Sequence, residues 1–146
     1  MKADTGAAML LHGTAIAWHG RGILLRGPSG TGKSDLALRV IAAGGMLVAD
    51  DQVLAQNTKA GIIAAPPPQI AGLIELRGVG LMRLPYLSSV RLAIVFDLVP
   101  PGTAERLPDL GRMVVAGISL PCGVVAPFEA SAVEKMVAVL RARPDL

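Results

Sequence analysis

The stretch GPSGTGKS at residues 27–34 decides how the rest of the chain is interpreted. It fits the pattern G-x-x-x-x-G-K-[ST], in which backbone N–H groups and the start of the following helix surround a polyphosphate. The lysine and the hydroxyl residue of the pattern reach phosphate oxygens and Mg²⁺. The alternative is an ordinary glycine-rich turn that contains a lysine. The phosphate-loop interpretation predicts nucleotide binding by Gly27, Pro28, Ser29, Gly30, Thr31, Gly32, Lys33 and Ser34.

The sequence on either side supports the phosphate loop. Residues 22–26 form a short apolar run typical of a buried strand, and residues 35–43 carry apolar side chains at helical spacing. Strand, glycine turn and helix therefore follow in the order that the motif requires, which favours nucleotide binding over a chance match.

Length and composition indicate one compact domain over residues 1–146. The chain is 52% hydrophobic and 17% charged, which argues for a well-buried α/β protein rather than a disordered one. Only 3% of the residues are aromatic, so the core must consist of Ala, Val, Leu and Ile.

Charge and cysteine content narrow the partners and the compartment. The net charge of +3 comes from scattered Lys and Arg without interleaved aromatic residues, which favours an anionic ligand such as ATP or an acidic protein over nucleic acid. The single cysteine, Cys122, excludes an internal disulfide and supplies no cysteine cluster for a metal. The first residues lack an export signal, and no apolar run approaches the ~20 residues that span a bilayer. We expect a cytoplasmic protein without membrane association.

Turn residues divide the first half of the chain into hairpins. Residues 19–22 read as a turn between antiparallel strands, so that a hairpin delivers the phosphate loop, and Gly44 and Gly45 end the helix that follows it. The expected strands are 14–18, 22–25, 46–49, 53–56 and 62–65, with a turn at 57–61. Because most of these strands are joined by hairpins, a mixed sheet is expected rather than a parallel one.

The second half contains fewer and longer elements. Pro66, Pro67 and Pro68 predict a rigid extended connection, after which residues 69–76 are expected to start a short helix and residues 77–80 to form a loop. Strands are expected at 90–98, 110–115 and 117–120. The closing helix is expected within residues 127–143, with Ser131 as its N-cap and Val133, Met136, Val137 and Leu140 on its apolar face.

Asp50 and Asp51 end the apolar run that begins at residue 46. Phosphoryl transfer needs a metal to bridge phosphate oxygens and a carboxylate to position or deprotonate the acceptor. Strand ends open toward the ligand crevice in open α/β sheets, so this pair is a candidate for that role. A solvated turn is the alternative, because Asp is common in turns.

Four motifs follow one another along the chain: His12-Gly13, the phosphate loop, the aspartate pair within LVADD at 47–51, and IELRGVG at 74–80. Together they resemble the catalytic domain of HPr kinase/phosphorylase, and the last is similar to a signature of that family. The resemblance covers roughly the first two thirds of the chain. It implies a fold related to phosphoenolpyruvate carboxykinase, an α/β phosphate-loop domain with a mixed, hairpin-rich sheet and flanking helices.

The resemblance also implies a role for individual residues, beginning with the phosphate and metal contacts. Lys33 would hold the β- and γ-phosphates of ATP, Ser34 a Mg²⁺ ion, and Glu75 a second magnesium position. Asp51 would take the proton from a substrate serine, and Asp50 would support it or the metal.

The remaining matches are less specific. His12 matches an active-site histidine, although a lone histidine is more often structural. Arg106 aligns with an active-site arginine but has different neighbours, and by itself it would be a surface arginine. Arg77 is expected either to support transition-state charge or to anchor its loop.

The chain also departs from the family. The N-terminal domain of long family members has no counterpart, residues 81–89 replace a flexible substrate loop, and residues 121–127 lack the segment linked to dephosphorylation. Kinase activity is therefore a safer prediction than the reverse phosphorolysis. Family members assemble as hexamers, and the apolar surplus here fits some homo-oligomer.

These observations lead to three functional hypotheses. The first is a Mg-ATP-dependent protein serine kinase that acts on HPr or a related phosphocarrier of the phosphotransferase system. The second is a regulatory module that binds ATP and a partner protein but transfers nothing. The third, a small-molecule kinase or carboxykinase-like enzyme, ranks last because the sequence contains no recognisable substrate pocket.

Overall fold

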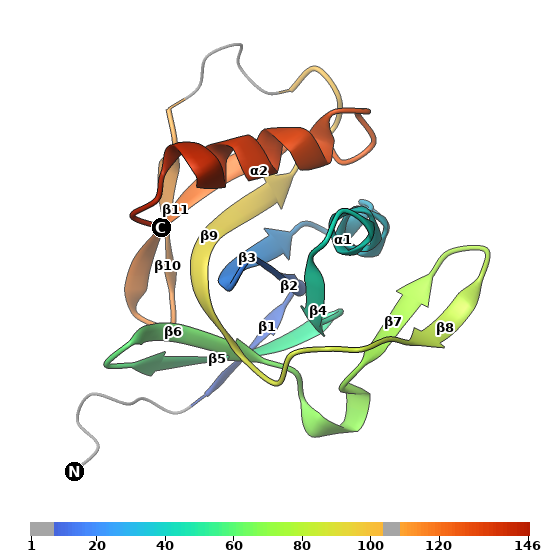
Figure 1. Cartoon of the computed structure of the whole chain (residues 1–146), viewed down its shortest axis with the longest axis horizontal. Helices are drawn as coiled ribbons and strands as arrows, with labels where there is room; N and C mark the ends of the chain where they lie inside the picture. The colour runs from blue at the N-terminus through green and yellow to red at the C-terminus, as the bar shows by residue number, and fades with distance from the viewer. Residues whose placement is uncertain (1–7, 104–108) are drawn as a thin grey trace.

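The computed structural model describes residues 8–103 and 109–146, which form a curled mixed sheet with two helices (Figure 1). The strands are β1 (Met9–His12), β2 (Thr14–Trp18), β3 (Arg21–Arg26), β4 (Met46–Ala49), β5 (Gln52–Thr58), β6 (Gly61–Ala65), β7 (Leu73–Leu76), β8 (Gly80–Arg83), β9 (Val90–Leu98), β10 (Gly111–Val115) and β11 (Ile118–Val125). The helices are α1 (Lys33–Ala42), α2 (Ala132–Ala142) and a 3₁₀ turn, η1 (Pro68–Ile70).

The main sheet has nine strands among the described residues, and its order confirms the mixed, hairpin-rich prediction. The central path is β1-β5-β6-β9-β3-β2-β4. Off this path, β11 pairs with the end of β9 on the side opposite β3, and β10 pairs with β11. Only β3 with β9 and β9 with β11 are parallel, while the remaining pairs are antiparallel.

Strand β9 connects the two parts of this sheet. Val90 and Arg91 pair with β6, whereas the residues that follow pair with β3 and then with β11. The strand curves strongly along this path (Figure 1). Because β3 and β9 run in parallel, Arg26 and Asp97 lie opposite each other where both strands end.

The predicted hairpin does deliver the phosphate loop. β2 pairs antiparallel with β3 from Thr14 opposite Leu25 to Trp18 opposite Arg21. The turn between them contains His19 at φ 48° and Gly20 at φ 79°. Two central residues with positive φ match the right-handed twist of the strands and make a tight connection.

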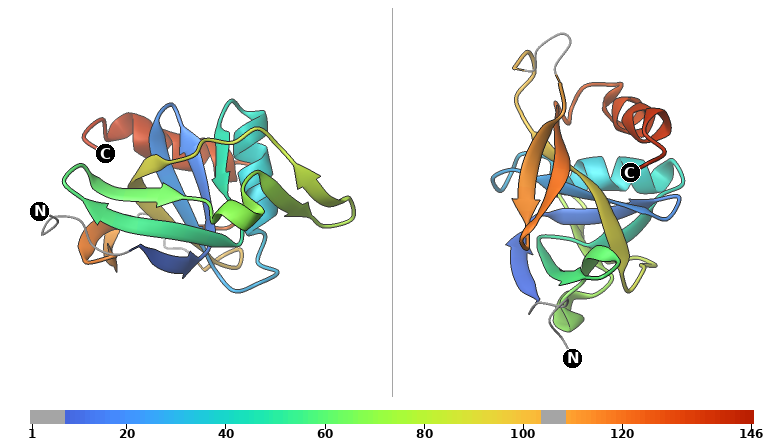
Figure 2. Two further views of the ribbon diagram at one scale, coloured as in Figure 1. Left: turned by 90° about the horizontal axis from the view of Figure 1, so that it is seen from below. Right: turned by 90° about the vertical axis from the view of Figure 1, so that its left-hand side faces the viewer.

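Apolar side chains cover both faces of the hairpin. On one face α1 and α2 pack side by side over β2, β3 and β9 (Figure 2), and on the other face β4, β5, β6 and β11 enclose a second cluster. Met136 and Leu140 of α2 are fully buried, with Val133 and Val137 nearly so, which confirms the predicted apolar face. The phosphate loop therefore leaves a strand whose central residues have no contact with water.

The second, smaller sheet is the hairpin of β7 and β8. It extends from the body beside α1 (Figure 1) and is attached through Ile74 and Leu76, which pack on Leu47 and Leu38. Its tip is the predicted glycine-punctuated loop at residues 77–80.

The predicted helix at residues 69–76 is wrong. Only η1 is helical, and Gly72 at φ 79° ends it and starts β7. A side chain at Gly72 would lie 3.0 Å from the Tyr86 ring, so a glycine is required there. Ile74 and Leu76 are buried while Glu75 between them is exposed, and this alternation of period two is the strand signal that the prediction missed.

Two further predictions need correction. β11 continues through residue 125 rather than ending at 120, because Cys122 and the residues after it gain β9 as a parallel partner. Ser131 holds the N-cap position of α2, but its side chain makes no capping hydrogen bond. Its backbone lies at φ −96° and ψ 14° rather than in the β region that capping hydroxyls adopt.

Candidate active site

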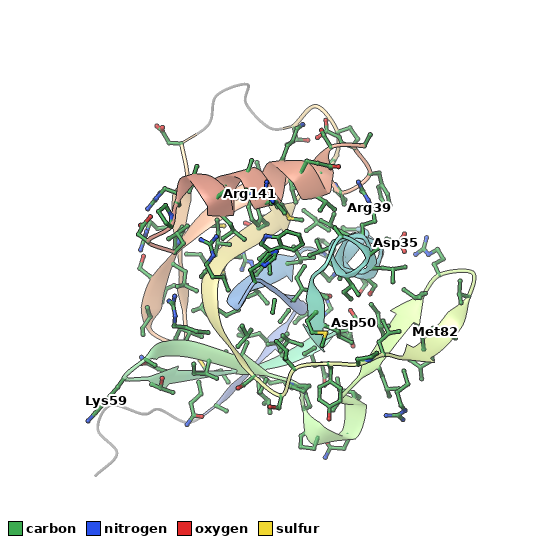
Figure 3. The ribbon with its side chains drawn as sticks, viewed as in Figure 1. Asp35, Arg39, Asp50, Lys59, Met82 and Arg141 are labelled. Atoms are coloured by element: carbon green, nitrogen blue, oxygen red, sulfur yellow. The ribbon has the colours of Figure 1, made fainter. Side chains whose placement is uncertain are left out.

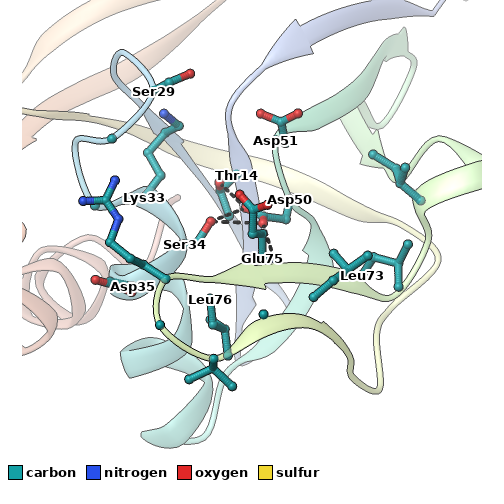
Figure 4. Close-up of a pocket in the computed structure, with 18 of the residues that line it drawn as sticks. Thr14, Ser29, Lys33, Ser34, Asp35, Asp50, Asp51, Leu73, Glu75 and Leu76 are labelled. Carbon is teal, nitrogen blue, oxygen red and sulfur yellow. Dashed lines mark hydrogen bonds between the residues drawn. The ribbon is translucent and has the colours of Figure 1, made fainter.

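A cavity of about 740 Å³ lies between the phosphate loop and the hairpin of β7 and β8 (Figure 4). The loop and the start of α1 form one wall, the hairpin forms the other, and the end of β4 contributes the aspartate pair. The cavity thus brings together Lys33, Ser34, Asp50, Asp51 and Glu75, which are far apart in the sequence.

The phosphate loop is closed by its own hydrogen bonds. The carbonyl of Pro28 accepts bonds from the backbone N–H of Thr31 at 3.2 Å and from Thr31 Oγ1 at 2.7 Å. Gly32 is the N-cap of α1 at φ 102°, and its carbonyl accepts the first helical bond, from Leu36 N. A glycine is needed at this φ, and its position makes the start of α1 face the cavity.

Lys33 is nearly buried and bends back over the loop. Its Nζ donates to the carbonyl oxygens of Gly27 at 2.6 Å and Pro28 at 3.0 Å. Burial lowers the pKa of the Lys33 ammonium, and the negative charges of Asp51 and Asp50 partly oppose this shift. A buried cation without a carboxylate in direct contact is well suited to an anionic ligand.

Asp50 lies at the bottom of the cavity, where only 6% of its surface is exposed. Ser34 Oγ donates to both of its carboxylate oxygens, at 2.9 and 3.0 Å, and Thr14 Oγ1 donates to one of them at 2.9 Å. The backbone N–H of Glu75 donates to the other at 3.2 Å. We call Thr14, Ser34 and Asp50 the site floor. Its hydrogen bonds join β2, α1, β4 and β7 at one point.

Asp51 has the opposite environment. Its side chain is 71% exposed and turns away from Asp50 (Figure 4), and its Oδ1 lies 3.7 Å from Nδ1 of His12. The backbone adopts φ 69°, and Gln52 N donates to the Asp50 carbonyl at 2.8 Å across this tight turn. Positive φ is uncommon for a residue with a side chain and often marks a functional position. We call His12 and Asp51 the site rim.

His12 and Asp51 connect two hollows. Asp51 lines the main cavity, whereas His12 lines a second hollow of about 440 Å³ on the other side of the phosphate loop. Arg26 and Asp97 also line this second hollow, where Arg26 Nε lies 2.9 Å from Asp97 Oδ1. The rim therefore borders both hollows, Asp51 on the side of the main cavity and His12 on the side of the second one.

The hairpin brings the signature residues toward the phosphate loop. Glu75 lines the cavity beside Asp50 (Figure 4). Arg77 also lines the cavity, and its Nη2 would be 3.7 Å from a Cβ placed on Gly30. Arg106 lies outside the residues that the structure describes.

Sequence reasoning missed Thr14 and Phe128. Thr14 is fully buried and bonded to Asp50, and its position one residue after His12-Gly13 was the available signal. Phe128 lines the cavity although it is remote from every motif, so only the fold could reveal it.

No helix among residues 8–103 and 109–146 has the length and apolar character needed to cross a membrane. The same residues contain no group of three or more His, Cys, Asp or Glu side chains arranged to bind a metal.

The mixed sheet, the hairpin-fed phosphate loop and the bonded serine–aspartate pair define a phosphate-loop protein of the mixed α/β class. A family model described as "HPr Serine kinase C-terminal domain" matches residues 5–90. The chain belongs to this family.

Curated relatives agree with this assignment. A protein from Malacoplasma penetrans named HPr kinase/phosphorylase is 30% identical over 148 residues, which covers 93% of this chain and 49% of the relative. HPr kinase/phosphorylase 1 of Oceanobacillus iheyensis is 36% identical over 127 residues, covering 79% of this chain and 41% of the relative. The chain thus spans half or less of the length of these relatives.

A solved structure supports the fold independently. The HPr(Ser) kinase/phosphatase of Coxiella burnetii matches with a TM-score of 0.82 over 94% of this chain and 92% of that one, at 21% identity. The agreement confirms the predicted mixed α/β fold.

Proposed function

We propose that this chain is a Mg-ATP-dependent protein serine kinase whose acceptor is HPr or a related phosphocarrier protein. The observation that carries the proposal is the arrangement of Lys33, Ser34 and Asp50 beneath a cavity whose rim presents Asp51. Membership of the HPr serine kinase family supports the choice of acceptor.

The floor and the loop suit a magnesium-bound polyphosphate. Mg²⁺ usually keeps several waters and binds through one or two carboxylates together with substrate phosphates, so a dedicated cluster of protein ligands is not required. Ser34 and Asp50 already share a hydrogen bond, and Glu75 is adjacent, which matches this set of oxygen donors. The metal would neutralise charge on the phosphates, while Lys33 would exchange its loop carbonyls for phosphate oxygens.

The rim suits proton removal from the acceptor. A serine hydroxyl is a weak nucleophile, and a carboxylate within hydrogen-bonding reach can take its proton as it attacks the γ-phosphate. Asp51 is exposed and held by a backbone turn, which gives it access to a serine on another protein. His12 would orient Asp51 or contact the transferred phosphate.

The direct test is a transfer assay. Purified protein is incubated with γ-labelled ATP, Mg²⁺ and an HPr-type carrier, with a carrier in which the acceptor serine is replaced by alanine as the control. We expect label on the serine of the first carrier only. Addition of inorganic phosphate to the labelled carrier tests the reverse reaction, in which phosphate attacks phosphoserine and releases pyrophosphate and the serine hydroxyl.

The second hypothesis, a non-catalytic ATP-binding module, is favoured by one observation. Residues 81–89 replace the flexible substrate loop, and the part after β8 is tied to the body because Leu84 N donates to Gly72 O and Leu87 N donates to Leu47 O. ATP binding without transfer to any carrier would support this alternative and exclude the kinase.

We also propose a homo-oligomer. Met9 and Leu10 are about half exposed on β1, the strand at one edge of the sheet. An exposed apolar edge strand offers unpaired N–H and C=O groups with which a strand of another chain can pair. Light scattering coupled to size-exclusion chromatography will measure the mass, and a monomer at micromolar concentration would contradict this proposal.

A further inference from the structure

Phe128 is a large apolar side chain that the fold leaves exposed. It lies between β11 and α2, 66% of its surface is exposed, and it is one of only two phenylalanines in the chain. The other, Phe96, is buried in the core. An exposed aromatic ring that lines a cavity is more informative than an exposed residue elsewhere, because such rings commonly contact ligands.

The Phe128 ring packs against the phosphate loop. A Cβ placed on Gly32 would be only 2.8 Å from Cζ of the ring, with two further ring carbons at 3.2 and 3.3 Å. Gly32 directly precedes Lys33 and caps α1. The ring therefore adjoins the loop on the side of the helix start, while Lys33 reaches back to Gly27 and Pro28.

The segment that carries Phe128 is fastened to the helix that begins at the loop. Arg39 of α1 donates to the carbonyl oxygens of Pro127 at 2.7 Å, Ala130 at 3.1 Å and Glu129 at 3.2 Å. Figure 3 shows Arg39 between α1 and the segment that leads into α2. Because the backbone on both sides of Phe128 is bonded to α1, the position from which the ring projects is held relative to the phosphate loop.

The tip of the hairpin that forms the opposite wall of the cavity also presents apolar side chains, beside the charged Glu75 and Arg77. Val79 and Leu81 at the tip of the β7–β8 hairpin are exposed and line the same cavity as Phe128. The cavity therefore has polar groups at its floor, where Ser34 and Asp50 lie, and three exposed apolar side chains, Phe128, Val79 and Leu81, among the residues that line it. A nucleoside phosphate has the same division between charged phosphates and an aromatic base.

We propose that Phe128 is the stacking surface for the base of the nucleotide. This inference rests on the proposed nucleotide-dependent function and adds the residue that holds the nucleoside. Stacking on an aromatic ring tolerates different bases, so Phe128 contributes affinity for nucleotides over inorganic polyphosphate rather than selection of one base.

The test compares ATP with inorganic tripolyphosphate, which has the phosphates but no base. Binding of each to wild type, Phe128→Ala and Phe128→Tyr is measured by calorimetry in Mg²⁺. We expect Phe128→Ala to weaken ATP binding by about tenfold or more, with tripolyphosphate binding within about twofold of wild type. Phe128→Tyr keeps the ring and should bind both ligands as wild type does. Thermal unfolding should be unaffected, because the ring is exposed.

Other outcomes would overturn the inference in distinguishable ways. Equal weakening of both ligands would mean that the ring only supports the phosphate loop. Unchanged ATP binding in Phe128→Ala would remove the ring from the site while leaving the kinase proposal intact. Wild-type protein that binds tripolyphosphate but not ATP would refute the kinase proposal together with this one.

Discussion

The site floor and the site rim contain adjacent aspartates in opposite environments. Asp50 is buried and accepts hydrogen bonds from two hydroxyls and a backbone N–H, whereas Asp51 is exposed and lies 3.7 Å from His12. The floor holds four elements of the fold together, so its geometry is fixed before any ligand binds. The rim must instead meet a group on another molecule, so it is left accessible.

The backbone separates these two environments within one residue. The turn at Asp51, with φ 69°, directs successive side chains to opposite sides of the strand end. Such a conformation costs stability, and its presence beside the proposed nucleotide site leads us to expect that the direction of the Asp51 side chain matters for function. Changes at the floor should therefore weaken folding as well as activity, and changes at the rim should lower activity without weakening folding.

The largest expected effect separates activity from folding at the rim. Asp51→Asn keeps the size and the turn preference of the side chain but removes the base. We expect serine phosphorylation to fall by about 10²-fold or more, while the free energy of unfolding stays within about 0.5 kcal/mol of wild type. Initial rates with labelled ATP and urea unfolding curves measure the two quantities. A variant with wild-type rates would remove Asp51 from the chemistry.

At the floor the effect on folding should be large. Asp50→Ala removes the acceptor of the buried Thr14 hydroxyl and of two partly buried donors, the Ser34 hydroxyl and the Glu75 N–H, so all three lose their partner. We expect the free energy of unfolding to fall by about 1–3 kcal/mol, measured by urea unfolding beside Asp51→Asn as the matched control. Equal stability of the two variants would contradict the distinction between floor and rim.

Removing strain at the rim should stabilise the protein. Asp51→Gly places glycine at φ 69°, where it has no steric penalty. We expect the free energy of unfolding to equal or exceed that of wild type by up to about 1 kcal/mol, with phosphorylation lost. Ala116→Gly is the control, because Ala116 also has positive φ, at 48°, but lies in the turn between β10 and β11. Clear destabilisation by Asp51→Gly would show that the side chain anchors the turn.

The smallest expected effect is a pH dependence from Lys33. Burial lowers the pKa of Lys33 in the folded protein below the ordinary value of 10.5. At pH values between the folded-state pKa and 10.5, the unfolded chain therefore binds more protons than the folded one. Stability contributed by this group therefore rises with pH across that window. The unfolding free energy of wild type relative to Lys33→Met should increase as the pH is raised from neutrality toward 10.5. A decrease over the same range would show that the folded protein raises the pKa instead.

The predictions near the phosphate loop succeeded because local sequence determines local structure there. The turn at 19–22, the glycine loop and the apolar run of α1 each specify their conformation without help from distant residues. The helix predicted at 69–76 failed because its apolar residues pack on Leu47 and Leu38 as a strand, which is a tertiary preference. β11 was predicted too short because its last residues need β9 as a partner. The single-domain organisation and the role of each site residue remain predictions.

The sequence alone determined the motifs, their order, the mixed sheet and the residues expected to hold phosphate. These follow from the spacing of glycine, charged and apolar residues along a short stretch of chain. The tertiary structure alone decided that Thr14 completes the floor, that Asp50 is buried while Asp51 is exposed, and that Phe128 lies against Gly32. The physical reason is that burial and long-range contact depend on which strands and helices become neighbours. Residues separated by nearly a hundred positions, such as Gly32 and Phe128, meet only in the folded protein.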